Sequence, residues 1–437
     1  MENTKPILVI KRKQAKKLHK RGCSIREIGI RLGSGTRHVN RWINMSDEDL
    51  EKDNRGWKKG KPRKYTEEQK KEIKKIRLQL EKEGSFFIGS LVVQGNYNKL
   101  HTSKVSKSFV GRTLKEYKMV KTPQKKRKGI SRYMKYPQHT LNKMGKCMMS
   151  IDFIGPKYLE GSDDRINFLS CKYIRPSKEG IVKRVKGQTT EEAIRVLTEV
   201  WTDNPVPDVL RIDNDSSFGA NLSREKQLGS FALFLLNLGV RPLYIAPRSP
   251  WNNGSVEGHN SVFSKKFWNK LRFTDEEEVD VKIKGFNLDY EKYTKLVNNN
   301  PPLENPKFMD DFKGVDLKNK EVKNFKEHKI CFLRIARREG EKGGINEYGF
   351  IDILKHEIKL PVDLINLFIY CVLDIKKKKL FCYTETKDGN LEKVNGINLK
   401  LKMYFIDNTL QKCQKNCGMI LCPFHMKHNR YLSIYPH

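Results

Sequence analysis

The 437-residue sequence lacks the features that define several classes of proteins. It contains no run of about 18 apolar residues, so we expect no membrane-spanning helix. It has no N-terminal segment in which positive charge is followed by an apolar stretch, so secretion is not expected. The nine cysteines are odd in number and scattered, which argues against a disulfide scaffold and favours reduced thiols inside a cell.

Acidic residues are also scarce, since 51 Asp and Glu stand against 87 Lys and Arg, which gives a formal net charge of +36. The first 150 residues hold 40 of the basic residues and only 13 of the acidic ones. So basic a chain is expected to bind a polyanion, with nucleic acid as the first candidate. Composition alone does not separate DNA from RNA, from an anionic membrane surface or from a lysine-rich solvated surface.

Residues 1–48 have the pattern of a helix-turn-helix domain. A basic helix is expected to end at Gly22, and Ser24 then begins a capping box that opens a second helix. After a Gly-Ser-Gly turn, a third helix starts at Thr36 and turns four polar residues outward, namely Arg37, His38, Asn40 and Arg41. Because Arg and Asn make bidentate contacts with guanine and adenine edges, the pattern predicts DNA binding. The alternative is an ordinary three-helix core with a solvated face.

Residues 49–120 are expected to form a second helix-turn-helix or winged DNA-binding domain. Thr66 begins another capping box and a helix that runs to about Glu83, and a glycine-rich, β-prone stretch follows. The segment 106–117 then has the pattern of an amphipathic helix, with Lys107 and Arg112 among its outward residues. Two such domains in tandem suit a protein that recognises a long DNA site.

Residues 121–145 are interpreted as a basic linker that lies along a phosphate backbone. Its densest cluster is Lys125, Lys126, Arg127 and Lys128. In a eukaryote this cluster would also suit a nuclear import signal, although such clusters are common. We therefore expect an intracellular, DNA-associated protein, located in the nucleus of a eukaryote or in the cytoplasm and nucleoid of a prokaryote.

From Cys147 the pattern changes to alternating strands and helices. The expected order is three strands, a helix, a strand, a helix, a strand and a last helix, over 147–155, 165–174, 180–186, 189–201, 208–213, 231–238, 240–246 and from about 253. That order is the RNase H-like layout, a mixed five-stranded sheet with flanking helices. In such a sheet the first and fourth strands are neighbours.

Three carboxylates occupy informative positions in this layout. Asp152 and Asp213 end the first and fourth strands, and Glu257 faces them from the last helix. Converging carboxylates repel one another unless a divalent cation neutralises them, and Mg²⁺ prefers such oxygen ligands. Two ions can support an in-line phosphoryl displacement. A single Asp at a strand end is usually a turn or cap residue, which is our interpretation of Asp163, Asp164 and Asp215.

Three segments of this region resemble the catalytic core of insertion-sequence DDE transposases, which share the retroviral integrase fold. They are SIDFIGP around Asp152, LRIDND around Asp213 and SPWNNGSVEGHNSVFSKKFW around Glu257. The resemblance covers about 147–270, inside a core assigned to 146–300, and the order of modules matches along nearly the whole chain. It implies that the three carboxylates are the catalytic triad and bind two Mg²⁺ or Mn²⁺ ions.

The same resemblance implies the reaction and the partners. The expected chemistry is hydrolytic cleavage at transposon ends, followed by attack of the freed 3′-OH on target DNA. A homo-oligomer on paired ends is also implied. Two departures are present, because Asp215 replaces the glycine common in the family and because 43 residues separate Asp213 from Glu257. That spacing exceeds the retroviral one, and we expect an insertion within 218–229.

The C-terminal third contains two further predictions. Short strands within 301–400 suggest a small SH3-like β-barrel, which the family often has for DNA or subunit contacts; a structural cap is the alternative. The tail, 401–437, holds a cluster of zinc-type ligands, namely Cys413, Cys417, Cys422, His425 and His428. Their spacing matches no known finger, so a Zn²⁺ site and a tail of free thiols both stay open.

Two other functions remain open for the chain as a whole. One is a sequence-specific DNA-binding protein derived from a transposase that has lost catalysis. The other is an RNase H-like nuclease that cleaves without joining. The presence of all three carboxylates argues against the first, and the paired helix-turn-helix patterns argue against the second.

Overall fold

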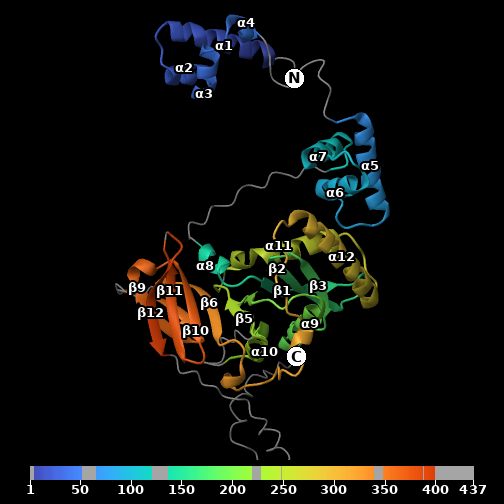
Figure 1. The fold of residues 1–437 in the computed structure, drawn as a ribbon, viewed down its shortest axis with the longest axis vertical. Coiled ribbons are helices and arrows are strands. Elements are labelled where there is room, and N and C mark those ends of the chain that lie inside the picture. The colour runs from blue at the N-terminus through green and yellow to red at the C-terminus, as the bar shows by residue number, and fades with distance from the viewer. Residues whose placement is uncertain are drawn as a thin grey trace, which may run out of the picture. The chain divides into compact units, whose positions relative to one another are not determined.

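The computed structural model describes residues 4–51, 65–120, 136–218, 228–247, 249–338, 348–386 and 388–398. The chain divides into two compact units, Met1–Gln69 and Lys70–His437 (Figure 1). No helix in these described ranges is long and apolar enough to cross a membrane.

The first unit is a small helical domain with its own core. Its helices are α1 (Thr4–Lys20), α2 (Ile25–Leu32), α3 (Thr36–Ile43) and α4 (Asp47–Glu51). They pack around Ala15, Ile28, Val39 and Trp42. The predicted cap is present, because the Ser24 side chain accepts a hydrogen bond from the Glu27 N–H at 3.3 Å.

Three more helices follow this domain along the chain. They are α5 (Glu67–Lys82), α6 (Ser90–Leu100) and α7 (Lys107–Glu116). The β-prone stretch expected after α5 is instead the helix α6, because Val93 and Tyr97 are buried one turn apart and this packing outweighs strand propensity. The described residues 65–120 contain no strand, so the wing that we considered is not found there.

The first five strands of the central sheet follow one another along the chain as predicted. Its first five strands are β1 (Met148–Tyr158), β2 (Arg165–Arg175), β3 (Gly180–Val185), β4 (Val209–Ile212) and β5 (Arg241–Tyr244). β1 pairs antiparallel with β2 and parallel with β4, and β4 pairs parallel with β5. The first and fourth strands are therefore neighbours, as expected.

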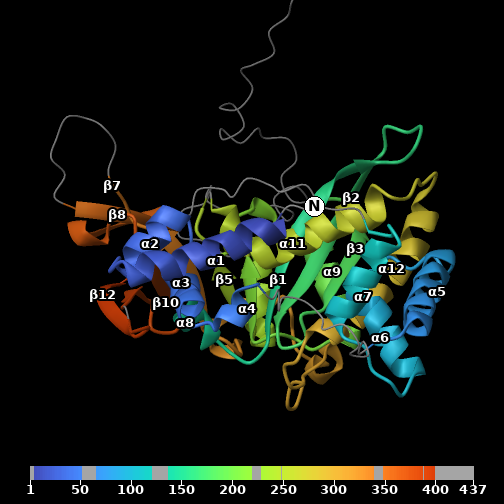
Figure 2. The ribbon, with the colours of Figure 1, turned by 90° about the horizontal axis from the view of Figure 1, so that it is seen from above.

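Helices cover both faces of this sheet (Figures 1 and 2). α9 (Thr190–Asp203) and α10 (Ser230–Leu238) pack on one face, and α11 (Gly254–Phe263) and α12 (Glu276–Val297) on the other. Shorter elements are α8 (Gln138–Asn142), η1 (Ser216–Phe218), η2 (Pro250–Asn253), the π-helical η3 (Ser264–Trp268), η4 (Met309–Phe312), η5 (Val322–Asn324) and η6 (Val362–Leu364).

The C-terminal strands differ from the expected separate barrel. β6 (Lys329–Ile335), β10 (Phe368–Asp374), β11 (Lys379–Glu385) and β12 (Leu391–Asn398) continue the central sheet, which has nine strands rather than five. β7 (Arg337–Arg338), β8 (Tyr348–Ile353) and β9 (His356–Pro361) form a second sheet. The reason is the edge of β5, whose free backbone groups are taken up by parallel pairing with β6.

The α5–α7 segment is attached to the α12 side of the core by aromatic side chains. Phe86 and Phe87 pack against Phe286 and Tyr290 of α12. The Phe86 N–H also donates to the Asp289 carboxylate at 3.0 Å. Residues 70–120 of the predicted second DNA-binding domain, 49–120, are thus part of the same compact unit as the sheet, whereas its described residues 49–51 and 65–69 belong to the first unit.

Candidate active site

Asp152 lies on β1, and Asp213 directly follows the neighbouring strand β4. Ser150 of β1 pairs with Arg211 of β4 in parallel register, and two residues further along each strand the chain reaches Asp152 and Asp213. Because side chains alternate between the faces of a sheet, both carboxylates project to the same face. Sequence reasoning placed both residues at strand ends; Asp152 instead lies within β1, which runs on to Tyr158.

That face is the one covered by α11. Along β1, Met149 and Ile151 point into the core shared with α9 and α10, whereas Ser150 and Asp152 point the other way. Asn260 of α11 donates through Nδ2 to Asp152 Oδ2 at 2.7 Å. Glu257 lies three residues before Asn260, and this spacing puts both side chains on one side of the helix.

Two further contacts attach α11 to the strands. Asn253, at the helix start, is hydrogen-bonded to the Ser150 hydroxyl and donates to the Ile151 carbonyl at 3.4 Å. His259 Nδ1 lies 2.9 Å from Ser170 Oγ, and Ser170 is the cross-strand partner of Asp152. The helix is therefore held on β1, which carries Asp152, and on the neighbouring strand β2.

His259 shows how closely the helix approaches the sheet. Its ring is buried, and burial together with the nearby Lys172 charge lowers its pKa to about 3, so the imidazole is neutral. A Cβ atom on Gly180 of β3 would come within 2.5 Å of His259 Nε2. Any larger residue at position 180 would displace the His259 ring.

The three carboxylates influence one another electrostatically. Burial, followed by the charges of Asp213 and Glu257, raises the pKa of Asp152 to about 7, although the Asn260 hydrogen bond opposes the shift. Burial also raises the pKa of Asp213, against a hydrogen bond from the Asp215 N–H at 3.1 Å. The pKa of Glu257 is raised by burial as well.

No described Lys or Arg forms an ion pair with any of these three carboxylates. Carboxylate oxygens are the donors that Mg²⁺ and Mn²⁺ prefer, so the donor chemistry fits a divalent cation. Among the described residues, however, no three His, Cys, Asp or Glu side chains form a group that could hold a metal ion as they stand. A cation held by all three carboxylates would need their side chains to lie closer together than they do in this arrangement.

The neighbouring acidic residues behave as turn residues. Asp164 is hydrogen-bonded to the Ser162 hydroxyl at 2.7 Å, in the turn between β1 and β2. Asp215 accepts from the Ser217 N–H at 2.8 Å, at the start of η1. Asp163 is exposed in the same β1–β2 turn.

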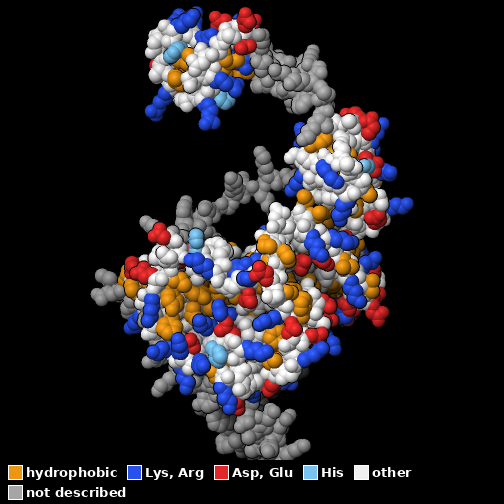
Figure 3. All heavy atoms as spheres, viewed as in Figure 1, with side chains coloured by type: hydrophobic (Ala, Val, Ile, Leu, Met, Phe, Trp, Pro, Cys, Tyr) orange, Lys and Arg blue, Asp and Glu red, His pale blue; other side chains and the backbone are white. Residues whose placement is uncertain are grey.

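The predicted DNA-contacting residues lie on solvent-facing helix surfaces where they are described. On α3 the exposed set is Arg37, His38, Asn40 and Arg41, with Val39 and Trp42 buried beneath. Figure 3 shows basic side chains projecting from the edge of this unit where Figure 1 places α2 and α3. On α7, Lys107 and Arg112 are exposed.

Several predicted residues lie outside the described ranges. They are the basic cluster Lys125, Lys126, Arg127 and Lys128 and the zinc-type ligands Cys413, Cys417, Cys422, His425 and His428. The interpretation of the linker and of the tail therefore stays a prediction.

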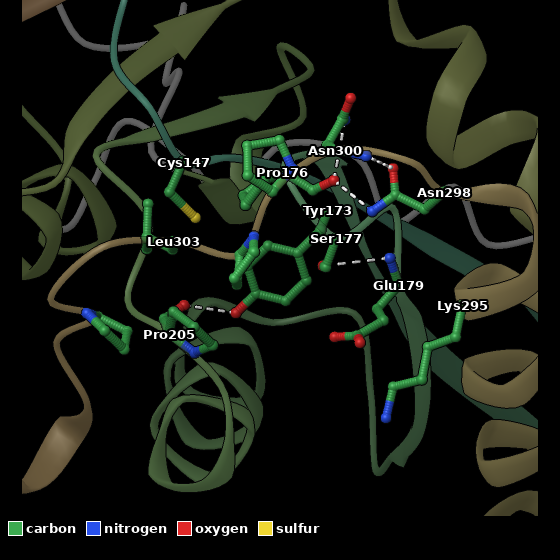
Figure 4. Close-up of a pocket in the computed structure, with 13 residues that line it drawn as sticks. Cys147, Tyr173, Pro176, Ser177, Glu179, Pro205, Lys295, Asn298, Asn300 and Leu303 are labelled. Carbon is green, nitrogen blue, oxygen red and sulfur yellow. Dashed lines mark hydrogen bonds between the residues drawn. The ribbon is translucent and has the colours of Figure 1, made fainter.

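A pocket of about 430 Å³ lies elsewhere on the same core (Figure 4). Its wall includes Cys147, which precedes Asp152 by five residues, or about 16 Å along an extended strand. Asn298 and Asn300 donate to the Pro176 carbonyl at 2.8 and 3.1 Å, and so join the segment after α12 to the β2–β3 turn. The pocket therefore lies where the segment after α12 packs against the β2–β3 turn, away from the carboxylates.

Sequence reasoning missed the residues that hold α11 in place. Asn253, His259 and Asn260 all lie within the segment that carries Glu257, but their partners are on β1 and β2. One signal was available, because the three-residue spacing from Glu257 to Asn260 puts an amide beside the carboxylate on a helix. The Ser170 and Gly180 partners required knowledge of strand register.

Comparisons with known proteins found similarity among solved structures only. No family model matches the chain, and no curated protein matches it. One solved structure, the cryo-electron microscopy structure of the simian T-cell lymphotropic virus intasome in complex with PP2A regulatory subunit B56 gamma, contains a chain similar to 73% of this chain over 95% of its own length. The sequence identity is 10% and the TM-score is 0.30, a level that carries no argument about function.

Proposed function

We propose that the protein is a DNA transposase of the DDE type, which binds the ends of a mobile element and catalyses metal-dependent strand cleavage and strand transfer. One observation carries this proposal. Asp152 and Asp213 each follow the paired residues Ser150 and Arg211 of neighbouring parallel strands by two positions, and the helix that bears Glu257 is hydrogen-bonded to Asp152 itself. The charges of Asp213 and Glu257 both act on Asp152, and no described Lys or Arg forms an ion pair with the three carboxylates. Such a group is suited to bind divalent cations.

Asp152, Asp213 and Glu257 would hold the cations. Bound cations supply neutralisation of phosphate charge and activation of the attacking oxygen. Asn260 acts on Asp152, since its hydrogen bond favours the ionised carboxylate that a cation needs. Asn253 and His259 keep α11, and with it Glu257, against the strands.

The DNA-binding part of the proposal is supported by the helical domains. The exposed face of α3 presents Arg37, Asn40 and Arg41, whose side chains have the donors and acceptors that read base edges in a major groove. Lys107 and Arg112 offer a second basic face on α7. Duplex DNA is thus the proposed partner, with a homo-oligomer assembled on paired ends.

A strand-transfer assay tests the proposal. Inverted repeats that flank the gene would supply the labelled end DNA, and a supercoiled plasmid would be the target, with Mg²⁺ or Mn²⁺ present. Joined products from the wild type, and none from Glu257→Gln, are the expected result. End binding without cleavage would instead identify a DNA-binding protein, and cleavage without joining would identify a nuclease.

A further inference from the structure

A basic groove runs along the outer side of α5. It has a volume of about 610 Å³ and is lined by Lys71, Lys74, Lys75, Leu78, Gln79, Lys82 and Tyr117. Four of the seven lining residues are lysines, and none is acidic. Acidic neighbours stand at its margin, where Glu72 lies 3.8 Å from Lys75 and Glu83 accepts from Gln79 at 2.9 Å.

The opposite side of α5 fixes which way this groove faces. Ile73, Ile76 and Arg77 are buried. The Arg77 guanidinium donates to Glu81 at 2.9 Å and to the backbone carbonyls of Ile88 and Met119. Because these contacts hold one side of the helix inward, the lysine side is directed to solvent.

The aromatic ring of Tyr117 also lines the groove. Tyr117 follows the last residue of α7, and the Lys74 ammonium lies 5.3 Å from the centre of its ring. Lys70 at the start of the groove is engaged by Glu116 at 3.1 Å, which joins α5 to the end of α7. Two helices therefore form the concave surface, and it does not depend on a single row of side chains.

The lysine spacing matches a phosphate backbone. Lys71, Lys75 and Lys82 lie on one side of the helix, and at 1.5 Å per residue the row is about 16 Å long. Each DNA strand carries one phosphate per roughly 3.4 Å of helix axis, so the row spans several phosphates. Leu78 is the one leucine that lines the groove, and it offers too little apolar surface for insertion into a membrane.

We propose that this groove binds the phosphate backbone of duplex DNA, in addition to the contacts expected from Lys107 and Arg112 on α7. The proposal rests on the proposed function, since it names a second contact surface for the same partner. The α5–α7 segment is attached to the core through Phe86 and Phe87, so DNA held in the groove is held by the unit that carries the carboxylates.

The test is the salt dependence of DNA binding by the full-length triple variant Lys71→Gln, Lys75→Gln, Lys82→Gln. Each lost phosphate contact removes about 0.9 from the slope of log affinity against log salt. A decrease in the magnitude of the slope of about 2.7, with affinity on the order of 100-fold lower at 0.15 M salt, is expected on random-sequence and end DNA alike. Lys74 is left in place because it covers the Tyr117 ring.

A second triple variant controls for net charge, with Lys318, Lys376 and Lys378 changed to Gln on exposed surface far along the chain. An unchanged slope in the α5 variant, with its thermal melt intact, would overturn the proposal, as would an equal loss in the control. A loss of binding to anionic lipid vesicles without a loss on DNA would overturn it too.

Strand transfer measured on the same preparations separates the two proposals. If wild type joins ends but the α5 variant binds DNA normally, only the groove is refuted. If DNA binding depends on the groove but wild type neither cleaves nor joins, the groove is supported and the proposed catalytic function fails.

Discussion

The two faces of the central sheet are covered by helices that are held in different ways. α9 and α10 pack through apolar side chains, such as Trp201 and Phe234, whose rings stack with centroids 6.0 Å apart. α11 also buries apolar residues, but Asn253, His259 and Asn260 attach it to the strands by hydrogen bonds. The apolar packing serves stability, whereas the polar attachments lie around Asp152, as expected if the proposed function requires α11 to be positioned on the strands.

The largest expected effect comes from Asp152→Asn, which removes a proposed cation ligand from the polar face. Cleavage and joining should fall by at least roughly 10³-fold, because preorganised charge stabilisation of this kind contributes about that factor. End binding should be unchanged in a gel-shift assay. The matched control is Asp164→Asn, a turn residue bonded to Ser162, which should keep full activity.

The same variant should alter stability in a pH-dependent manner. Burial raises the folded-state pKa of Asp152 from the usual 3.8 to about 7, so the folded protein loses stability as the pH rises through that window. The loss is at most about 4 kcal/mol, at roughly 1.4 kcal/mol per pKa unit. Asp152→Asn should therefore melt higher than wild type at pH 8 and equally at pH 4, and an equal melting difference at both pH values would contradict this account.

The apolar face should respond in the opposite way. Trp201→Ala removes a fully buried ring and should cost about 3–5 kcal/mol of unfolding free energy, measured by denaturant titration. Folded variant protein should bind Mn²⁺ as wild type does. Leu100→Ala, at a residue that is 68% exposed, is the control and should change stability little.

A smaller effect is expected where α11 contacts β3 closely. Gly180→Ala places a Cβ against His259 and should displace α11, at a cost of about 1–3 kcal/mol in stability. Strand transfer should fall together with stability. At Gly187 a Cβ would meet only the Thr189 methyl group at 3.6 Å, so Gly187→Ala should change neither stability nor strand transfer. Similar behaviour of the two variants would rule out the His259 contact as the cause.

The smallest effect should follow Asn260→Ala, which leaves the Asp152 carboxylate in place but removes its donor. Because that hydrogen bond lowers the Asp152 pKa, its loss should raise the pKa. Activity at pH 7 should drop about tenfold, a cost of about 1.4 kcal/mol, and recover in part at pH 8.5. A pH profile of unchanged shape would show that Asn260 has no effect on Asp152, and Asn324→Ala, at an exposed amide, is the control.

The sequence was most informative where local patterns are strong. Strands of alternating or continuous apolar residues and capped helices predicted the order of β1 to β5, and the β1–β4 neighbourhood followed from that order. The prediction of a β-prone stretch where α6 lies was wrong, because the composition does not reveal that Val93 and Tyr97 are buried by tertiary packing. The continuation of the sheet through β6 depends on pairing between Leu243 and Cys331, 88 residues apart, which no local pattern encodes.

The candidate site shows the same limit. Asp152, Asp213 and Glu257 could be proposed from residue type and position, but the contacts that hold them could not. His259 requires the register of β2 against β1 and a glycine on β3, and Asn260 requires the crossing of α11 over β1. Such contacts are set by tertiary geometry, so their partners are distant in sequence.

The most direct test of the central claim is a Mn²⁺ titration by isothermal calorimetry, with no DNA present. Wild type, Asp152→Asn, Asp213→Asn and Glu257→Gln would be compared at pH 8, where Asp152 is mostly ionised. The account predicts binding by wild type and at least about tenfold weaker binding by each variant, which is about 1.4 kcal/mol per lost ligand. Wild-type affinity in any one of the three variants would show that its carboxylate does not belong to a shared cation site.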